Sequence, residues 1–263
     1  MRRYPLLDDP KVRRFIFFPR REAFVMFRIP GTRLVSVEVE EGIKIVCRFY
    51  ITSKDSPSIL FFHGNGEIAA DYDDIAPHYL SRGINLFVAD YRGYGLSGGE
   101  PTAAALISDA LAVFETFREL ILKEGMSAQL FVMGRSLGSV PAIEIAHRRG
   151  EELCGLIIES GFSNTIRLLS YLGILDLDPS LEEEEGFGNG EKIRRIQIPT
   201  LIIHAERDTL IPISEAEELY RNSQSRRKEF LVIPGADHND IMLRGGSLYF
   251  DKIAEFVKAS SSK

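Results

Sequence analysis

Apolar and polar residues alternate near the start of the chain and then give way to continuous apolar runs. In residues 35–40 every second residue is valine, and residues 43–51 alternate again after Gly42. Alternation with a period of two is typical of a strand with one exposed face. These two segments predict an antiparallel hairpin at the edge of a sheet.

From Ser58 onward, short apolar runs lie between segments with helical periodicity. Apolar runs separated by helices are typical of a parallel sheet covered on both faces. The runs predict strands at 58–62, 84–90, 130–133, 155–159, 200–204 and 230–233. The helical segments are 71–82, 102–124, 137–149, 214–222 and 248–258. The pattern therefore predicts an α/β protein, with a mostly parallel eight-stranded sheet, an antiparallel N-terminal edge and helices on both faces.

The segment Gly134-Arg135-Ser136-Leu137-Gly138 lies between one of these apolar runs and the helix that follows it. A serine in a sharp turn between a strand and a helix matches the nucleophile elbow, whose strained backbone holds the hydroxyl above the sheet. Gly134 and Gly138 fit this turn because a Cβ at either position would collide with the neighbouring strand and helix. The alternative is a glycine-rich turn with an incidental serine. The strand–turn–helix context favours Ser136 as a nucleophile.

A serine hydroxyl needs a neighbouring base, and the base needs an acid to orient it. Asp208 follows the predicted strand at 200–204, and His238 follows the next strand. Parallel strands bring such loops to the edge of the sheet at which Ser136 lies. The order serine, acid, histidine is also one of the known orders of such triads. We therefore assign Ser136, Asp208 and His238 as catalytic residues.

Backbone N–H groups must hold the oxyanion that forms during acyl transfer. One is expected from Leu137, the residue after the nucleophile. The other is expected from the loop after the strand at 58–62, which reads His63-Gly64-Asn65-Gly66, and we assign it to Asn65. His63 lies too early in the chain to be the base, and we expect it to brace this loop by hydrogen bonding.

Other charged residues near these positions leave alternatives open. Glu159 ends the strand at 155–159, where some triads place the acid, and Glu206 and Asp237 are two further candidates. Arg135 and Glu67 flank the site in sequence. They either pair across the elbow or lie at the surface as solvated charges.

Together these motifs resemble the α/β-hydrolase superfamily. Within it, the chain looks most like the subgroup of monoacylglycerol lipases, α/β-hydrolase-domain thioesterases, lysophospholipid lipases and bud-emergence-type proteins. The matching segments are 63–66, 90–98, 134–138, 199–204 with Asp208, and 235–238, and the resemblance covers roughly residues 58–257. It implies the α/β-hydrolase fold and a serine hydrolase without a cofactor. It leaves the substrate open, because this fold hosts many chemistries.

The chain departs from that subgroup in two places, which argue against a lipase. We expect no N-terminal membrane anchor, and the segment 161–199, where relatives often fold a helical lid, is short. We expect one domain over residues 1–263, with an N-terminal arm at 1–34 and a short cap insertion at 161–199. Within the cap, the acid-rich stretch 176–191 is expected to be mobile and solvated.

Substrate contacts are expected from four residues around the predicted site. They are Gly66, Phe162, Tyr171 and Leu172. The last two can form an apolar wall for a short or medium acyl group.

Composition limits which binding partners and which cellular compartment are expected. A net charge of −6 argues against a nucleic-acid partner. Cys47 and Cys154 lie far apart and suit two free thiols in a reducing cytoplasm. The five histidines form no metal-ligand pattern, and no apolar run approaches the length of a membrane span. The basic residues 1–28 are expected to pack on the body of the protein rather than on a membrane, and nothing indicates an oligomeric state.

These observations predict a hydrolase of carboxylic esters or thioesters. An aminopeptidase or amidase of the same fold is an alternative, but it needs a group for the substrate amine that the sequence does not identify. A non-catalytic interaction protein that keeps the fold is the other alternative, and the intact triad speaks against it.

Overall fold

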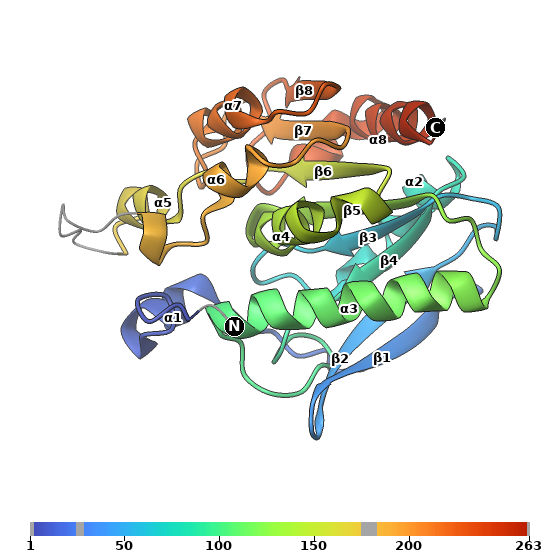
Figure 1. Cartoon of the computed structure of the whole chain (residues 1–263), viewed down its shortest axis with the longest axis horizontal. Helices are drawn as coiled ribbons and strands as arrows, with labels where there is room; N and C mark the ends of the chain where they lie inside the picture. Colours follow the sequence, from blue (N-terminus) through green and yellow to red (C-terminus); the bar gives the residue numbers. More distant parts are fainter. Residues whose placement is uncertain (1–2, 25–28, 175–182, 262–263) are drawn as a thin grey trace.

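The computed structural model describes residues 3–24, 29–174 and 183–261. Its centre is an eight-stranded sheet in the order β1-β2-β4-β3-β5-β6-β7-β8 (Figure 1). The first two pairs, β1 with β2 and β2 with β4, are antiparallel, and all the others are parallel. The strands are β1 Arg33–Glu40, β2 Ile43–Tyr50, β3 Ser58–Phe62, β4 Asn85–Ala89, β5 Leu130–Arg135, β6 Gly155–Glu159, β7 Thr200–Ala205 and β8 Lys228–Ile233. The predicted fold class is confirmed.

Helices cover both faces of this sheet, with α3 and α4 on one side and α2 and α8 on the other (Figure 1). The α-helices are α1 Pro10–Ile16, α2 Ala76–Leu80, α3 Ala103–Lys123, α4 Ser139–Arg149, α5 Thr165–Tyr171, α6 Asn189–Ile193, α7 Ile213–Asn222 and α8 Ile241–Ser260. Short 3₁₀ helices are η1 Ala69–Asp73, η2 Ser136–Gly138, η3 Gly150–Glu152 and η4 Glu183–Glu185.

Two apolar cores, one on each face, hold the central strands in place. Successive residues of β3 enter different cores, since Leu60 belongs to the core beneath α3 and α4 and Phe61 to the core beneath α8. All five residues of β3 are buried, as expected of a strand covered on both sides. The strand ends are therefore rigid supports for the loops that follow them.

Two predicted helices differ from the observed ones. The segment 71–82 is split into η1 and α2, because Pro77 lies in the first turn of α2 and has no N–H to continue a preceding helix. The last helix begins at Ile241 rather than at 248 and bends at Gly246, whose φ is 47°. Glycine tolerates that backbone angle, so the periodicity on either side belongs to two segments joined by a bend.

The N-terminal arm packs on the body of the protein. Leu7 and Ile16 belong to the core beneath α3 and α4, and the ring of Tyr4 lies 5.5 Å from the ring of Phe187. Helix α1 therefore lies at the same end of the molecule as α5 (Figure 1). Phe18 is exposed. None of the helices described is long and apolar enough to cross a membrane.

Part of the cap makes specific hydrogen bonds that the sequence did not predict. Glu183 accepts hydrogen bonds from Thr165 Oγ1 at 2.8 Å, Ile166 N at 3.1 Å and Gly188 N at 2.9 Å. Phe187 is buried behind it. The expectation of a solvated stretch is therefore wrong for this part, because the carboxylate is used to join η4 to the start of α5. Residues 176–182 of that stretch lie outside the described residues.

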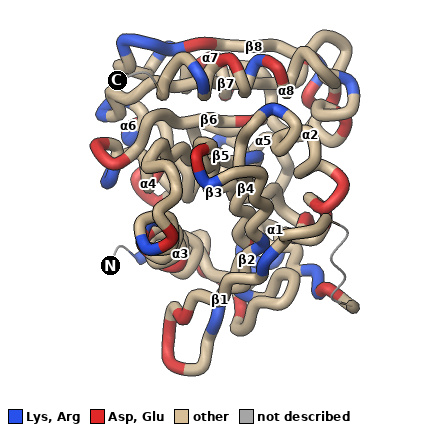
Figure 2. The backbone as a smooth tube through the Cα atoms, turned by 90° about the vertical axis from the view of Figure 1, so that its right-hand side faces the viewer, with Lys and Arg blue, Asp and Glu red and all other residues tan. Residues whose placement is uncertain are grey.

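Charges of both signs are interspersed along the chain (Figure 2). In the cap region, a hollow is lined by acidic and basic residues, which are Glu144, Glu183, Glu184 and Glu191 with Arg148, Lys192 and Arg195. Arg148 and Lys192 both contact Glu144 of α4, each at 2.5 Å, so part of this basic charge is used outside the acid-rich stretch.

Candidate active site

Ser136 lies in the turn between β5 and α4, with a backbone conformation that few side chains tolerate. Its φ is 52°, and Ser139 Oγ donates a hydrogen bond of 2.6 Å to its carbonyl oxygen. A Cβ at Gly134 would lie 2.0 Å from Gly138 O, and a Cβ at Gly138 would lie 2.1 Å from Phe62 O. Both positions therefore require glycine, since Gly134 packs against the backbone of the turn itself and Gly138 against the end of β3. Ser136 remains partly exposed.

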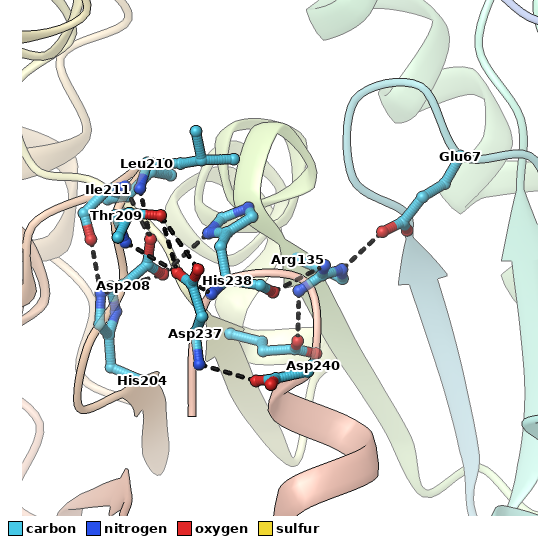
Figure 3. A network of polar contacts seen from close by, with 11 residues as sticks. Glu67, Arg135, His204, Asp208, Thr209, Leu210, Ile211, Asp237, His238 and Asp240 are labelled. Atoms are coloured by element: carbon cyan, nitrogen blue, oxygen red, sulfur yellow. Dashed lines mark hydrogen bonds and ion pairs between the residues drawn. The ribbon is translucent and has the colours of Figure 1, made fainter. Parts of the chain in front are cut away.

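His238 and Asp208 meet beyond the ends of β8 and β7. His238 Nδ1 lies 2.8 Å from Asp208 Oδ2 (Figure 3). The other carboxylate oxygen accepts the N–H groups of Leu210 at 3.0 Å and Ile211 at 2.8 Å. Burial raises the pKa of Asp208, but the hydrogen bond and charge of His238 and the N–H of Ile211 outweigh it, so the pKa is lowered. An ionised Asp208 holds the proton of a neutral imidazole on Nδ1, which leaves Nε2 able to accept one.

His204 also belongs to this region, although no sequence motif indicated that it contacts the loop of Asp208. It is fully buried at the end of β7, and its Nε2 donates to Ile211 O at 2.9 Å. The same nitrogen lies 3.5 Å from Asp208 Oδ2. Burial lowers the pKa of His204, so the ring is neutral and acts as a brace for the loop that carries Asp208. The available signal was a histidine at the end of an otherwise apolar strand.

The alternative acids Asp237 and Glu206 bind main-chain groups rather than the imidazole. Asp237 Oδ1 accepts from Thr209 N at 2.9 Å and from His238 N at 2.7 Å. Glu206 Oε2 accepts from Gly235 N at 2.7 Å. Both carboxylates thereby join the loop after β7 to the loop after β8.

Arg135 is buried, and it contacts three different segments. Its Nε lies 2.6 Å from Glu67 Oε1, its Nη1 lies 2.7 Å from Glu159 Oε1, and its Nη2 donates to His238 O at 3.0 Å. Arg135 and Glu67 therefore pair across the elbow, and the alternative of two solvated surface charges is wrong. The second oxygen of Glu159 accepts from Tyr249 Oη at 2.6 Å, so both of its oxygens have partners other than the imidazole.

The loop after β3, from which an oxyanion donor is expected, is held from several sides. His63 Nδ1 lies 2.8 Å from Gly64 O, and its Nε2 lies 3.2 Å from Asp90 Oδ1. The side chain of Asn65 accepts from Phe18 N at 2.9 Å and from Tyr94 Oη at 2.6 Å. The N-terminal arm therefore contacts the residue whose backbone N–H we assign to the oxyanion. Leu137, which supplies the other assigned N–H, is buried directly after Ser136.

The four residues expected to contact substrate are in different environments. Gly66 has a φ of 78°, and Phe162 is buried in the core beneath α4. Tyr171 and Leu172 are exposed at the end of α5, with 58% and 41% of their surface accessible.

A cavity of about 360 Å³ lies beside the loop that carries His238. Glu67 and Arg135 line it together with Asn239, Met242, Leu243 and Phe250. None of the four residues expected to contact substrate lines this cavity, which draws its apolar side chains from α8 and from the segment of η1 and the residues before α2. No sequence signal distinguished those side chains from core residues.

The described part of the chain brings together no group of three His, Cys, Asp or Glu residues that could hold a metal ion. Cys47 is buried and Cys154 is half-buried, and both are free thiols. Cys47 lies on β2 and Cys154 directly before β6.

Known proteins are similar to this chain in sequence and in fold. A family model described as serine aminopeptidase, S33, matches residues 53–169 and 190–242. Human alpha/beta hydrolase domain-containing protein 17B is 31% identical over 226 residues, which cover 82% of this chain and 72% of the human protein. Alpha/beta hydrolase domain-containing protein aho-3 of Caenorhabditis elegans is 29% identical over 214 residues, or 78% of this chain and 58% of the nematode protein.

Solved structures share the fold at low sequence identity. The esterase Pf2001 of Pyrococcus furiosus superposes with a TM-score of 0.74 at 20% identity, over 93% of this chain and 99% of the esterase. A soluble variant of monoglyceride lipase from Saccharomyces cerevisiae superposes with a TM-score of 0.69 at 15% identity, over 92% of this chain and 99% of the lipase. These two likenesses are to hydrolases of known structure, and they establish the common architecture.

Proposed function

Because the chain belongs to the α/β-hydrolase superfamily, in the family described as serine aminopeptidase, S33, we propose that it hydrolyses carboxylic esters or thioesters through an acyl-enzyme on Ser136. We assign small to medium acyl groups to it because the cap is short. The observation that carries the proposal is the 2.8 Å contact of His238 Nδ1 with Asp208. It is supported by the backbone of Ser136, which has a φ of 52° in the turn after β5. Strained backbone of this kind is concentrated at functional sites.

In the first half of the proposed reaction, Ser136 Oγ attacks the acyl carbonyl carbon, and His238 Nε2 takes the hydroxyl proton. Asp208 stabilises the imidazolium that forms. The backbone N–H groups of Asn65 and Leu137 donate to the oxyanion of the tetrahedral intermediate. The intermediate collapses, His238 protonates the leaving alcohol or thiol, and the acyl group stays on Ser136.

In the second half, water replaces the leaving group. His238 takes a proton from the water as its oxygen attacks the acyl-enzyme, and a second tetrahedral intermediate forms. Its collapse returns the proton to Ser136 Oγ and releases a carboxylic acid. The cycle consumes one water and needs no cofactor.

The family description makes an aminopeptidase the second candidate. Such an enzyme needs a carboxylate or another acceptor that is available to the substrate amine. Glu67 and Glu159 are the carboxylates that contact Arg135, and both are occupied by that guanidinium and by tyrosine hydroxyls. Neither of these two carboxylates is therefore available to a substrate amine, and we keep esters and thioesters as the first candidate.

Labelling by a fluorophosphonate tests the nucleophile. The wild-type protein should be labelled on Ser136, whereas the Ser136→Ala variant should fold with the same circular dichroism spectrum and take up no label. A protein that takes up no label in its wild-type form would be a non-catalytic member of the superfamily. Label on the alanine variant would place the nucleophile elsewhere.

A substrate panel then separates the two candidate activities. p-Nitrophenyl esters of increasing chain length, acyl-thioesters and aminoacyl amides should be compared by kcat/KM. We expect the esters or thioesters to give the higher values, with a decline at long chains. A higher kcat/KM for aminoacyl amides would favour the aminopeptidase.

A further inference from the structure

The residue directly before the proposed nucleophile joins the parts of the site together. Arg135 is 5% exposed, and its guanidinium contacts Glu67 from the loop after β3, Glu159 at the end of β6 and the main chain of His238 after β8 (Figure 3). Each of its three nitrogens contacts a different segment. These segments are distant in sequence, so no local preference brings them together.

The acceptors of this cluster are themselves fixed by further donors. Glu67 Oε2 accepts from Gly64 N at 2.9 Å and from Tyr72 Oη at 2.8 Å. Gly64 precedes Asn65, the residue assigned to the oxyanion. The position of Arg135 is thereby linked to the backbone of the loop after β3, as well as to Ser136 and His238.

Stability alone does not account for such a cluster. A guanidinium and two carboxylates lose hydration when they are buried, and apolar residues of similar volume are often as stabilising as a buried ion pair. An arginine fork has directional donors that can fix several acceptors at once, which neither a lysine nor an apolar side chain can do. Precise geometry between segments is thus the property that this arrangement supplies.

The charge state of Glu67 fits this role, whereas burial raises the pKa of Glu159. Burial alone would raise the pKa of Glu67, but the charge and hydrogen bond of Arg135 outweigh it and lower the pKa to about 2. Glu67 is therefore ionised in the whole range in which the proposed mechanism can operate. The Arg135–Glu67 contact then persists while the imidazole changes its charge.

We propose that Arg135 is a positioning residue, which sets His238 and the oxyanion loop relative to Ser136 through the carbonyl of His238 and the carboxylate of Glu67. Asp208 orients the imidazole ring, and Arg135 fixes the main chain from which that ring projects. This inference rests on the proposed function, since it concerns the reactivity of Ser136. It adds to that function a residue which does not touch the reacting atoms.

The test is the Arg135→Lys variant, which keeps the positive charge but cannot contact all three acceptors. Time-resolved labelling with a fluorophosphonate gives two quantities, the fraction of protein that can react and the rate at which it reacts. If Arg135 only stabilises the fold, its substitution should lower the fraction of protein that can react and the melting temperature, but not the labelling rate of the folded protein. A positioning role lowers the rate for the folded fraction, because displacements of about 1 Å at a reacting centre cost on the order of 100-fold in rate. We expect a loss of that order in the labelling rate and in kcat, with little change in KM.

Arg48→Lys is the matched control. Arg48 is also buried, and it also contacts two carboxylates, Asp73 at 3.0 Å and Glu22. It lies on β2, which β4 and β3 separate from β5. We expect a lower melting temperature but a wild-type labelling rate.

Glu67→Gln is the second variant, in case Arg135→Lys does not fold. It keeps the shape of the side chain and leaves Arg135 in contact with Glu159 and His238, so its labelling rate should fall less than that of Arg135→Lys. If the folded fraction of Arg135→Lys were labelled at the wild-type rate, the role of Arg135 would be overturned and the proposed function would remain. If Arg135→Lys is insoluble, a wild-type labelling rate in Glu67→Gln would have the same consequence. A wild-type protein that takes up no label would instead overturn the proposed function, and this inference with it.

Discussion

The carboxylates at the ends of β6, β7 and β8 have different partners, and the partner decides what each can do. Asp208 accepts from the imidazole of His238, Asp237 accepts from Thr209, and Glu159 accepts from Arg135 and Tyr249. A carboxylate that orients the base must contact its ring. Asp208 is the one of these three that does so.

At the residue scale, Asp208→Asn should lower kcat for a neutral p-nitrophenyl ester by roughly 10,000-fold, because the amide favours the wrong imidazole tautomer. Glu159→Gln should cost much less, since it acts only through Arg135. Steady-state kinetics of the two purified variants check this ranking. A larger loss for Glu159→Gln would move the acid to the end of β6.

The pH dependence follows from the same residues. The base must be neutral to accept the serine proton, so kcat/KM should rise with pH as the His238 imidazole loses its proton. The pKa of Asp208 is lowered from its ordinary value, so this carboxylate stays ionised through mildly acidic conditions. The ionised Asp208 stabilises the folded state at pH values above the ordinary pKa of a carboxyl group. This stabilisation is lost only as pH falls through the lowered pKa of the folded protein.

We therefore expect kcat/KM to increase from mildly acidic to neutral pH, because only a neutral imidazole can act as the base. The profile should be measured with a neutral ester, so that the substrate does not titrate. A rate that is flat over this range would exclude histidine as the base.

At the element scale, the elbow depends on the close approach of two backbones. The turn between β5 and α4 passes the end of β3 so closely that a Cβ at Gly138 would lie 2.1 Å from Phe62 O. A backbone atom cannot move aside as the end of a flexible side chain can. The conformation of Ser136 is therefore maintained by packing around glycine, and not by Ser136 itself.

Gly138→Ala should accordingly disrupt the elbow. We expect poor folding or a large loss of fluorophosphonate labelling, together with a lower melting temperature. Gly150→Ala is the control, because a Cβ there would lie 3.6 Å from Ile198 Cγ2, an ordinary contact. Glycine-to-alanine changes at such compatible positions are neutral or stabilising. If Gly138→Ala were labelled and melted like the wild type, the close approach in the structure would be wrong.

At the scale of the whole molecule, the N-terminal arm and the cap share one core with the sheet. Leu7 is fully buried among residues of that core, and Tyr4 packs against Phe187 from the cap. Phe18 N also donates to the side chain of Asn65. The arm therefore supports both the cap and the loop after β3.

Leu7→Ala should lower the free energy of unfolding by about 2–5 kcal/mol, the usual cost of removing a buried leucine side chain. Leu122→Ala is the matched control, since 58% of Leu122 is exposed on α3, and it should change stability by less than about 0.5 kcal/mol. Urea denaturation measures both. Equal midpoints for Leu7→Ala and the wild type would mean that the arm is detached in solution.

Local sequence patterns were enough to predict the strands, the long helix α3 and the tight turn between β5 and α4. Continuous apolar runs need burial on both faces, and the pair Gly134 and Gly138 fits a turn in which a Cβ has no room. The order of Ser136, Asp208 and His238 then predicts that loops at strand ends meet, because parallel strands end at one edge. Each of these conclusions depends on neighbours in the sequence or on the general geometry of a sheet.

Only the tertiary structure decided which side chains pair. From the sequence, Arg135 and Glu67 fit solvated surface charges as well as an ion pair, and the acid-rich cap predicts solvent contact for Glu183. Nothing in the sequence indicates that Asn65 binds Phe18 N. Arg135 and Glu67 are 68 residues apart in the sequence, Phe18 and Asn65 are 47 apart, and Glu183 and Thr165 are 18 apart. Pairing therefore depends on the final placement of whole elements, which no local pattern specifies.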